Sequence, residues 1–248
     1  MEGNIYYVKD DDPKMQEAFT KARSTFKYFW RELSWEFNRI VPALDLAFVK
    51  VACHQKKLFK GVQTEFMWIS NISFDGITVK GVLNNEPNVL TNIKLGDVVE
   101  VPVAEICDWM FSTNRKVYGG FTIQVIRAMM SENDRAAHDS AWGLDFGDPD
   151  KVLVAYEQEE KPENLTEHPM SIAMKDGLVQ FLQSQPENIT SKDADGYTML
   201  HRQAIAGNKA CVEVLLQMGA DINATTNSGY TASDFAKKLE WEHLISIL

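Results

Sequence analysis

The sequence predicts an α+β domain, with a curved antiparallel β-sheet and flanking helices, followed by a short all-α array of paired helices. Three observations support this prediction. Apolar residues recur at helical spacing over residues 15–33. Strand-like apolar runs follow between residues 46 and 103. Finally, Gly196-Tyr-Thr198 recurs thirty-three residues later as Gly229-Tyr-Thr231, and this period is typical of stacked helix pairs.

The composition is that of an ordinary soluble protein. The 248 residues, 45% hydrophobic and 24% charged, can bury a core and favour two domains over one. The N-terminus lacks the features of a signal peptide, and no apolar run approaches the roughly 20 residues of a membrane helix. The three cysteines are isolated, as expected of free thiols in a reducing compartment. We therefore expect a cytoplasmic protein with no membrane partner.

The net charge of −10 is concentrated in one segment. Residues 1–100 hold 13 acidic and 13 basic residues, whereas residues 131–168 hold eleven acidic and three basic residues. Nonspecific nucleic-acid binding depends on clustered lysine and arginine, and the sequence contains no basic stripe. We therefore expect no nucleic-acid partner.

The first predicted element is a long amphipathic helix. After a short apolar start at residues 5–8, the run Asp10-Asp-Asp-Pro13 offers an N-cap and an early helical proline. The apolar positions that follow include several aromatic residues, up to Trp30 and Leu33. Such a stripe is far more often core than a cofactor site.

Four strands are predicted next, because the apolar period changes to two and β-branched and aromatic residues are enriched. They cover residues 47–53, 65–73, 76–83 and 97–103. Short turns join them, including Ser73-Phe-Asp-Gly76, which is typical of a hairpin. Consecutive strands with short turns indicate an antiparallel sheet.

A last strand is predicted at residues 105–111, followed by a basic turn with Arg115 and Lys116. The pair Gly119-Gly120 permits a sharp backbone turn, and Thr122 is a candidate N-cap for the helix that follows.

Five short motifs follow one another in a fixed order in this region. They are Glu65-x-x-Trp68, Gly81-x-Leu-x-Asn-x-Pro87, Leu95-Gly-Asp97, Ile106-x-Asp-Trp109 and Gly119-Gly-x-Thr122. Together they resemble the bacterial domain-of-unknown-function family numbered 2314, over about residues 8–135. The resemblance implies no established activity.

The best candidate ligand site of this domain is Asp108 and Trp109 beside Gly119 and Gly120. One interpretation is structural: the aspartate binds turn amides and the tryptophan fills the core. The other is a pocket that binds a small ligand. A concave site with convergent polar groups, rather than a filled core, would favour the second.

The segment 143–167 is predicted to separate the domain at 1–142 from the repeats at 168–248. Its apolar run 152–156 is expected to form an added strand or a docking segment, and the acidic residues 157–167 a solvated linker. An acidic surface that attracts a basic partner is the alternative.

The repeats resemble ankyrin repeats, with about two and a half units and a shortened first unit from Pro169. In the central unit we expect Gly196 to form a left-handed turn, Thr198 to cap the first helix and Gly207 to end it. The resemblance implies that His201 stabilises the turn by hydrogen bonding.

The sequence departs from the ankyrin pattern at Met199, where proline is usual, and at Asp234, which replaces the equivalent of His201. At Gln203 a small alanine is usual. A long polar side chain at this packed position has to reach water or find a hydrogen-bond partner.

The functional prediction is a non-enzymatic protein that binds a protein partner through its repeats; an immunity-type or regulatory role is suggested by analogy alone. The partner surface is assigned to Tyr197, Gln203 and Tyr230, since tyrosine is enriched among residues that provide binding energy; mutual packing of the two rings is the alternative. No catalytic motif and no phosphate-binding loop is present, and the histidines are scattered, so we expect no catalytic residue, cofactor or metal. The alternative function is an enzyme or small-ligand sensor that uses Asp108, Trp109, Gly119 and Gly120.

Overall fold

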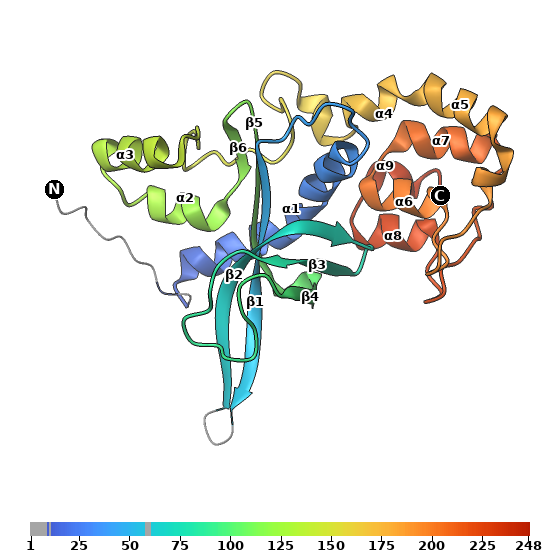
Figure 1. Ribbon diagram of the computed structural model, residues 1–248. Helices are drawn as coiled ribbons and strands as arrows, with labels where there is room; N and C mark the ends of the chain where they lie inside the picture. Colours follow the sequence, from blue (N-terminus) through green and yellow to red (C-terminus); the bar gives the residue numbers. More distant parts are fainter. Residues whose placement is uncertain (1–8, 10, 58–60) are drawn as a thin grey trace. The chain divides into compact units, whose positions relative to one another are not determined.

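The computed structural model describes Lys9 and residues 11–57 and 61–248 (Figure 1). The chain forms two compact units. The first comprises the residues up to Phe29 together with Arg39–Val154, and the second comprises Trp30–Asn38 together with Ala155–Leu248. The boundary at Val154 therefore falls inside the segment 143–167, and one short piece of the first part of the chain belongs to the second unit. The apolar start at residues 5–8 and the candidate cap Asp10 lie outside the described residues.

The first unit is a six-stranded antiparallel sheet with helices. Its elements are α1 (Pro13–Glu36, which continues into the second unit), β1 (Leu46–Lys57), β2 (Gly61–Phe74), β3 (Thr78–Leu83), β4 (Val98–Pro102), the 3-10 helix η1 (Val103–Glu105), β5 (Ile106–Thr113), β6 (Lys116–Gly119), α2 (Phe121–Arg127) and α3 (Glu132–Trp142). The strand order is β4-β3-β2-β1-β5-β6. The predicted α+β class and antiparallel sheet are confirmed.

The sheet is bent where strand registers shift. One shift lies between Lys50 and Val51, where β1 pairs with β5, and another lies between Ser70 and Ser73, where β2 pairs with β3. An extra residue in one strand bends it and increases its twist, and Asn71 in the second shift has a φ of 51°. The predicted curvature therefore has a local cause at both positions.

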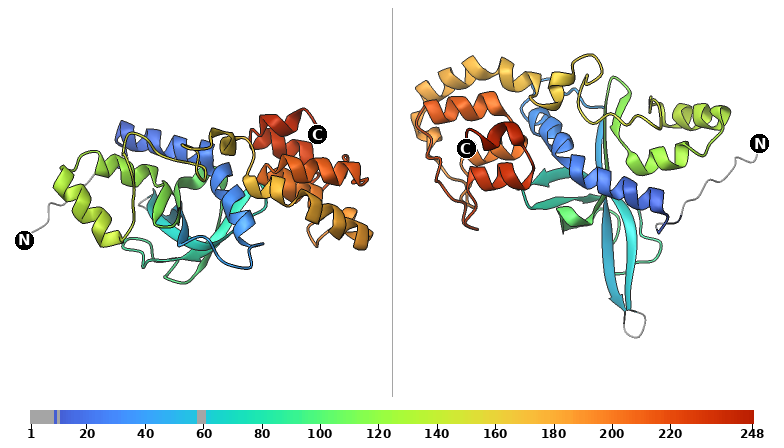
Figure 2. Two further views of the ribbon diagram at one scale, coloured as in Figure 1. Left: turned by 90° about the horizontal axis from the view of Figure 1, so that it is seen from above. Right: turned by 180° about the vertical axis from the view of Figure 1, so that it is seen from behind.

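The helix α1 provides the core of the first unit, as the apolar stripe predicts. Figure 2 shows this helix lying across the curved sheet. Phe26 and Phe29 are buried, and the Phe29 ring lies 5.8 Å from the Trp109 ring. The indole nitrogen of Trp109 donates to the carbonyl oxygen of Ala22 at 2.9 Å. Helix and sheet are thus joined by ring packing and by a buried hydrogen bond.

The sequence prediction for the turn after β5 was wrong. Lys116 does not belong to a basic turn but begins strand β6, and the turn is formed by Asn114 and Arg115, with φ of 49° and 68°. Asparagine tolerates this left-handed conformation, but without a glycine the turn gave only a weak hairpin signal. Of the two alternatives predicted for the run 152–156, the added strand does not form. Leu153 within the run instead accepts a hydrogen bond at its carbonyl oxygen from the Gly119 backbone amide at 2.7 Å.

The second unit contains three helix pairs. They are α4 (Pro169–Ala173) with α5 (Lys175–Ser184), α6 (Met199–Ala206) with α7 (Lys209–Gln217), and α8 (Ala232–Lys238) with α9 (Glu242–Ile245), and 3-10 helices η2 (Pro162–Leu165) and η3 (Pro186–Ile189) precede α4 and follow α5. The predicted helical array is confirmed (Figure 1). Thr198 caps α6, and Gly207 ends it in the left-handed conformation, as predicted.

The last turns of α1 complete the second unit. The Arg31 guanidinium donates to the carbonyl oxygens of Asn164, Leu165 and Thr166. Glu32 accepts from His168 at 2.9 Å, and both side chains are almost fully buried. The acidic stretch 157–167 is therefore not uniformly solvated, since Asn164 is buried within it.

Candidate functional site

Asp108 lies at the centre of the predicted ligand site and is fully buried. Its carboxylate accepts from the backbone amides of Trp109 at 2.8 Å, Phe121 at 2.9 Å and Thr122 at 2.8 Å. The Thr122 hydroxyl donates a fourth hydrogen bond at 2.6 Å. Burial raises the pKa of Asp108 to about 6, although the hydrogen bonds from Thr122 and Trp109 oppose this shift. The carboxylate oxygens are therefore engaged by the protein itself.

The same carboxylate corrects the prediction for Thr122. Helix α2 begins at Phe121, its N-cap is Gly120 with a φ of 74°, and Gly120 has no side chain to cap it. Thr122 is the second helical residue, so it cannot be the cap. Because the first amides of a helix have no partner within it, Asp108 from strand β5 supplies the acceptor for the amides of Phe121 and Thr122.

Trp109 and Gly119 are packed too closely to leave a cavity between them. A Cβ atom added to Gly119 would lie 2.2 Å from the Trp109 carbonyl oxygen and 2.5 Å from its ring. The ring also lies 5.6 Å from Phe121, in an edge-on arrangement. Trp109 is fully buried. The space around the predicted ligand site is therefore occupied by protein atoms.

Other family-motif residues have comparable structural roles. Glu65 accepts from the backbone amides of Asn88, Val89 and Leu90 at 2.8 to 3.2 Å, and so holds the loop before β4 against β2. These amides lower the pKa of Glu65, against the opposing effect of burial. A Cβ atom at Gly81 would lie 2.8 Å from the Ser70 carbonyl oxygen, so only glycine fits there.

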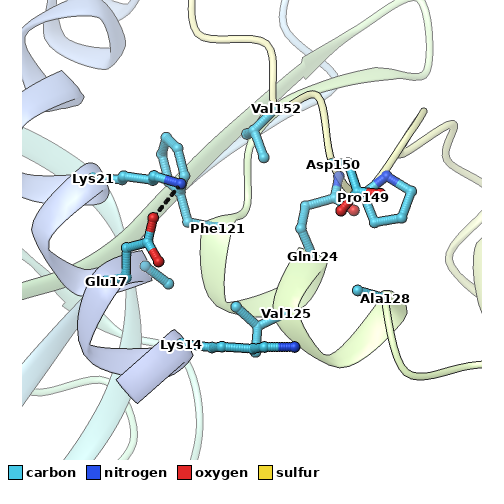
Figure 3. A pocket seen from close by; sticks show the side chains of 11 residues that line it. Lys14, Glu17, Lys21, Phe121, Gln124, Val125, Ala128, Pro149, Asp150 and Val152 are labelled. Carbon is cyan, nitrogen blue, oxygen red and sulfur yellow. Dashed lines mark ion pairs between the residues drawn. The ribbon is translucent and has the colours of Figure 1, made fainter. Parts of the chain in front are cut away.

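A pocket lies close to this region, in the same unit (Figure 3). It has a volume of about 230 Å³ and is formed by helix α1, helix α2 and the segment Pro149–Val152. Phe121 lines it, but Asp108, Trp109, Gly119 and Gly120 do not. The sequence did not indicate this pocket, because its lining residues are far apart in the chain. Lys14 and Val152, the first and the last of them, are separated by more than a hundred residues.

The tyrosines assigned to the partner surface pack against one phenylalanine. The rings of Tyr197 and Tyr230 lie 5.7 Å and 5.5 Å from Phe235. Tyr197 is only 7% exposed, and the Arg202 guanidinium lies 4.0 Å from its ring centre. These contacts connect neighbouring repeats through Phe235 rather than through mutual stacking of the tyrosines.

Gln203 has an internal hydrogen-bond partner. Its side-chain oxygen accepts from the side-chain nitrogen of Asn208 at 2.8 Å, and the Asn208 side-chain oxygen accepts from the Trp35 indole at 3.1 Å. The polar residue that replaces the usual alanine thus belongs to a chain of hydrogen bonds that ends on α1. Asn208 is buried, so its pairing matters for stability.

His201 stabilises the repeat turn, as expected. Its Nδ1 accepts from the Thr198 amide at 3.0 Å, and its Nε2 donates toward the carbonyl oxygens of Ala224 and Tyr230 at 3.0 and 3.1 Å. Burial lowers the pKa of His201, which favours this neutral ring. In the third repeat, Asp234 accepts from the Thr231 amide at 2.9 Å and completes the same capping box.

The sequence prediction missed an exposed apolar stripe on the first repeat. Ile172 is 61% exposed, Met174 43% and Phe181 37%. Met174, Gly177, Leu178 and Phe181 follow the spacing i, i+3, i+4, i+7, so they share one helical face. That spacing is visible in the sequence, but only the structure shows that Leu182, rather than Phe181, enters the core.

Two further observations concern the described residues. Among them, no three His, Cys, Asp or Glu side chains form a group suited to a metal ion. In the same part of the chain, none of the helices combines the length and the apolar character needed to span a membrane.

Comparisons with known proteins agree with the division of the chain into an α+β domain and a repeat array. The family model described as "Uncharacterized protein conserved in bacteria (DUF2314)" matches residues 12–146, and the model described as "Ankyrin repeats (3 copies)" matches residues 170–242. A protein of Neisseria meningitidis serogroup B that is named as an ankyrin repeat protein is 50% identical over 244 residues, which are 98% of this chain and 96% of that protein. The uncharacterized protein YegJ of Escherichia coli K12 is 33% identical over 61 residues, which are 25% of this chain and 40% of that protein. Both resemblances predicted from the motifs are confirmed, and the chain belongs to the DUF2314 family of bacterial proteins and carries ankyrin repeats after that domain.

Proposed function

We propose that this protein is a non-enzymatic, cytoplasmic interaction protein whose first ankyrin repeat binds a protein partner. The observation that supports the proposal is the apolar stripe formed by Met174, the N-cap of helix α5, with Leu178 and Phe181 on that helix. Terminal repeats of such arrays usually present a polar outer face, which keeps the array soluble. An apolar outer face on the first repeat is therefore expected to be covered by another protein.

The stripe has the features of a binding surface for apolar side chains. Gly177 lies between Met174 and Phe181 on the same face, and the nearest atom to a Cβ added there would be Met174 Cε at 3.8 Å. The absence of a side chain at Gly177 leaves room for an inserted group. Exposed methionine and aromatic side chains are well suited to such contacts, because they adapt to the partner and bury a large area.

Phe181→Asp tests this surface. Because Phe181 is 37% exposed and Leu182 is fully buried, replacing Phe181 should lower the melting temperature far less than replacing Leu182 would. The introduced charge should prevent burial of this face against an apolar partner. The tagged wild-type chain is used to recover partners from cells of the source bacterium, and each recovered protein is then purified and its affinity measured. Gln183→Asp, a polar and exposed position on the same helix, is the matched control.

The proposal requires a purified partner that binds the wild type and the Gln183→Asp variant equally and binds Phe181→Asp at least about tenfold more weakly. Equal binding of all three chains would exclude the stripe as the partner surface. Loss of binding together with a large fall in the melting temperature would also count against it, since the phenylalanine would then be structural.

The finer role that we propose is of immunity type or regulatory: the protein binds one partner and blocks its action. This rests on the ankyrin repeats, which also give the Neisseria relative its name, and on the absence of a recognised catalytic motif in the sequence. Co-expression with the products of neighbouring genes tests it. Growth inhibition by one such product, relieved by the wild type but not by Phe181→Asp, is the expected result. Cell fractionation checks the cytoplasmic location.

A further inference from the structure

The pocket between α1 and α2 has an apolar floor. Ala18 and Phe121 are 4% and 5% exposed, and Val125, Ala128 and Val152 also line the pocket. A volume of about 230 Å³ corresponds to about eight water molecules, at about 30 Å³ each in the liquid. The pocket is therefore large enough for a metabolite of roughly ten non-hydrogen atoms, but smaller than a typical drug site.

The wall formed by α2 is held in place by a buried hydrogen-bond network. Gln124 is 4% exposed; its side-chain nitrogen donates to the Phe146 carbonyl oxygen at 2.7 Å, and its oxygen accepts from Arg127 at 2.5 Å. Arg127 is 3% exposed and also forms two hydrogen bonds with Asp139, at 3.0 and 2.6 Å. Support of this kind fixes the orientation of a side chain that lines a binding site.

The charged groups around the pocket are balanced. Lys14, Glu17 and Lys21 come from α1, and Asp150 comes from the segment on the other side (Figure 3). Glu17 and Lys21 form an ion pair at 2.8 Å. Among the described residues, none forms a hydrogen bond or an ion pair with the Lys14 ammonium or the Asp150 carboxylate. Within the described ranges, one positive and one negative group are thus available to a ligand, on different walls of the pocket.

We propose that this pocket binds a small zwitterion with an apolar body, whose carboxylate contacts Lys14 and whose ammonium contacts Asp150. A pure anion would be attracted by the lysines but repelled by Glu17 and Asp150, and a pure cation would meet the opposite balance. A ligand with both charges satisfies both walls, while its hydrocarbon part covers the floor at Phe121. Two sources share this chemistry: a free amino acid, with both charges at one carbon, and a short peptide, with the charges at its ends.

Isothermal titration of the full chain with leucine and with glycyl-leucine tests the proposal. We expect at least one of them to bind with a Kd below about 1 mM, and the tighter of the two identifies the source. The blocked forms, N-acetylated at the amine or amidated at the carboxylate, should bind at least about tenfold more weakly, because each loses one charge-assisted contact.

Variants at the pocket connect binding to the structure. Lys14→Gln and Asp150→Asn should each weaken binding at least about tenfold, whereas Lys80→Gln, which removes an exposed lysine on β3, should leave it unchanged. Ala128→Trp should abolish binding, because Ala128 is exposed and lines the pocket, so the larger ring fills it without entering the core. The proposal is overturned if neither zwitterion binds, if the blocked forms bind equally well, or if binding survives Ala128→Trp.

Discussion

The repeats should not fold without the end of helix α1. Within the second unit, the Trp35 ring stacks on His168 at 5.9 Å, and its indole donates to Asn208. Arg31 lies over the Trp241 ring, 5.2 Å from its centre. These contacts join α1 to residues before the first repeat, within the second and within the third. A fragment that begins at His168 loses all of them.

The magnitude can be worked from Trp35, which is only 6% exposed. A buried tryptophan covers about 150–250 Å², which at about 25 cal/mol per Å² gives roughly 4–6 kcal/mol as an upper estimate. At about 0.05–0.15 kcal/mol per residue, a folded fragment of residues 168–248 would have a stability of only about 4–12 kcal/mol. The contacts of Trp35 alone are therefore comparable in free energy to the whole expected stability of the fragment.

Thermal unfolding followed by circular dichroism checks the prediction. The fragment 168–248 should show no cooperative transition, while the full chain should. In the full chain, Trp35→Ala should cost about 3–5 kcal/mol, and Trp35→Phe, which keeps a ring but loses the hydrogen bond to Asn208, should cost less. Trp142→Ala is the matched control, since Trp142 is 48% exposed and its loss should cost clearly less than the loss of Trp35. A cooperative melt of the isolated fragment, or equal effects of Trp35→Ala and Trp142→Ala, would refute the reasoning.

Three further predictions concern buried and half-buried side chains. Trp109→Ala should lower the free energy of unfolding by about 3–5 kcal/mol, as a core truncation, and an unchanged denaturation midpoint would contradict its structural role. Burial raises the pKa of Asp108 from 3.8 to about 6 in the folded chain, so protonation stabilises the folded state. The contribution of Asp108 to the stability of the folded state is then fully present below about pH 4 and is lost as the pH rises to about 6. The free energy of unfolding of the wild type, relative to that of Asp108→Asn, should therefore fall by up to about 3 kcal/mol over this pH range, as measured by urea unfolding. If this difference stays constant or rises with pH, the raised pKa of Asp108 is excluded. Tyr197→Ala with Tyr230→Ala should lower the melting temperature markedly, because both rings pack on Phe235; an intact melt with loss of a bound protein would restore the tyrosines as the partner surface.

The sequence by itself determined the features that depend on neighbours in the chain. The amphipathic stripe of α1 follows from an apolar period of 3.6 residues, and the strands follow from a period of two. The helix pairs follow from a sequence repeat of thirty-three residues, which is the length of one structural unit. The caps at Thr198 and the left-handed turn at Gly207 were also predictable, because a cap acts within three or four residues of its own position.

Only the tertiary structure decided what depends on residues far apart. Asp108 caps a helix that begins thirteen residues later, so the expected local cap at Thr122 was wrong. Arg31 binds carbonyl groups more than 130 residues away, which moves the end of α1 into the second unit. The sequence fixes the chemical character of such side chains, but their partners follow from strand order and helix packing, which bring together groups that no periodicity relates. The pocket beside Phe121 and the exposed face of α5 arise in the same way, because which side of an element stays uncovered depends on what packs against the other side.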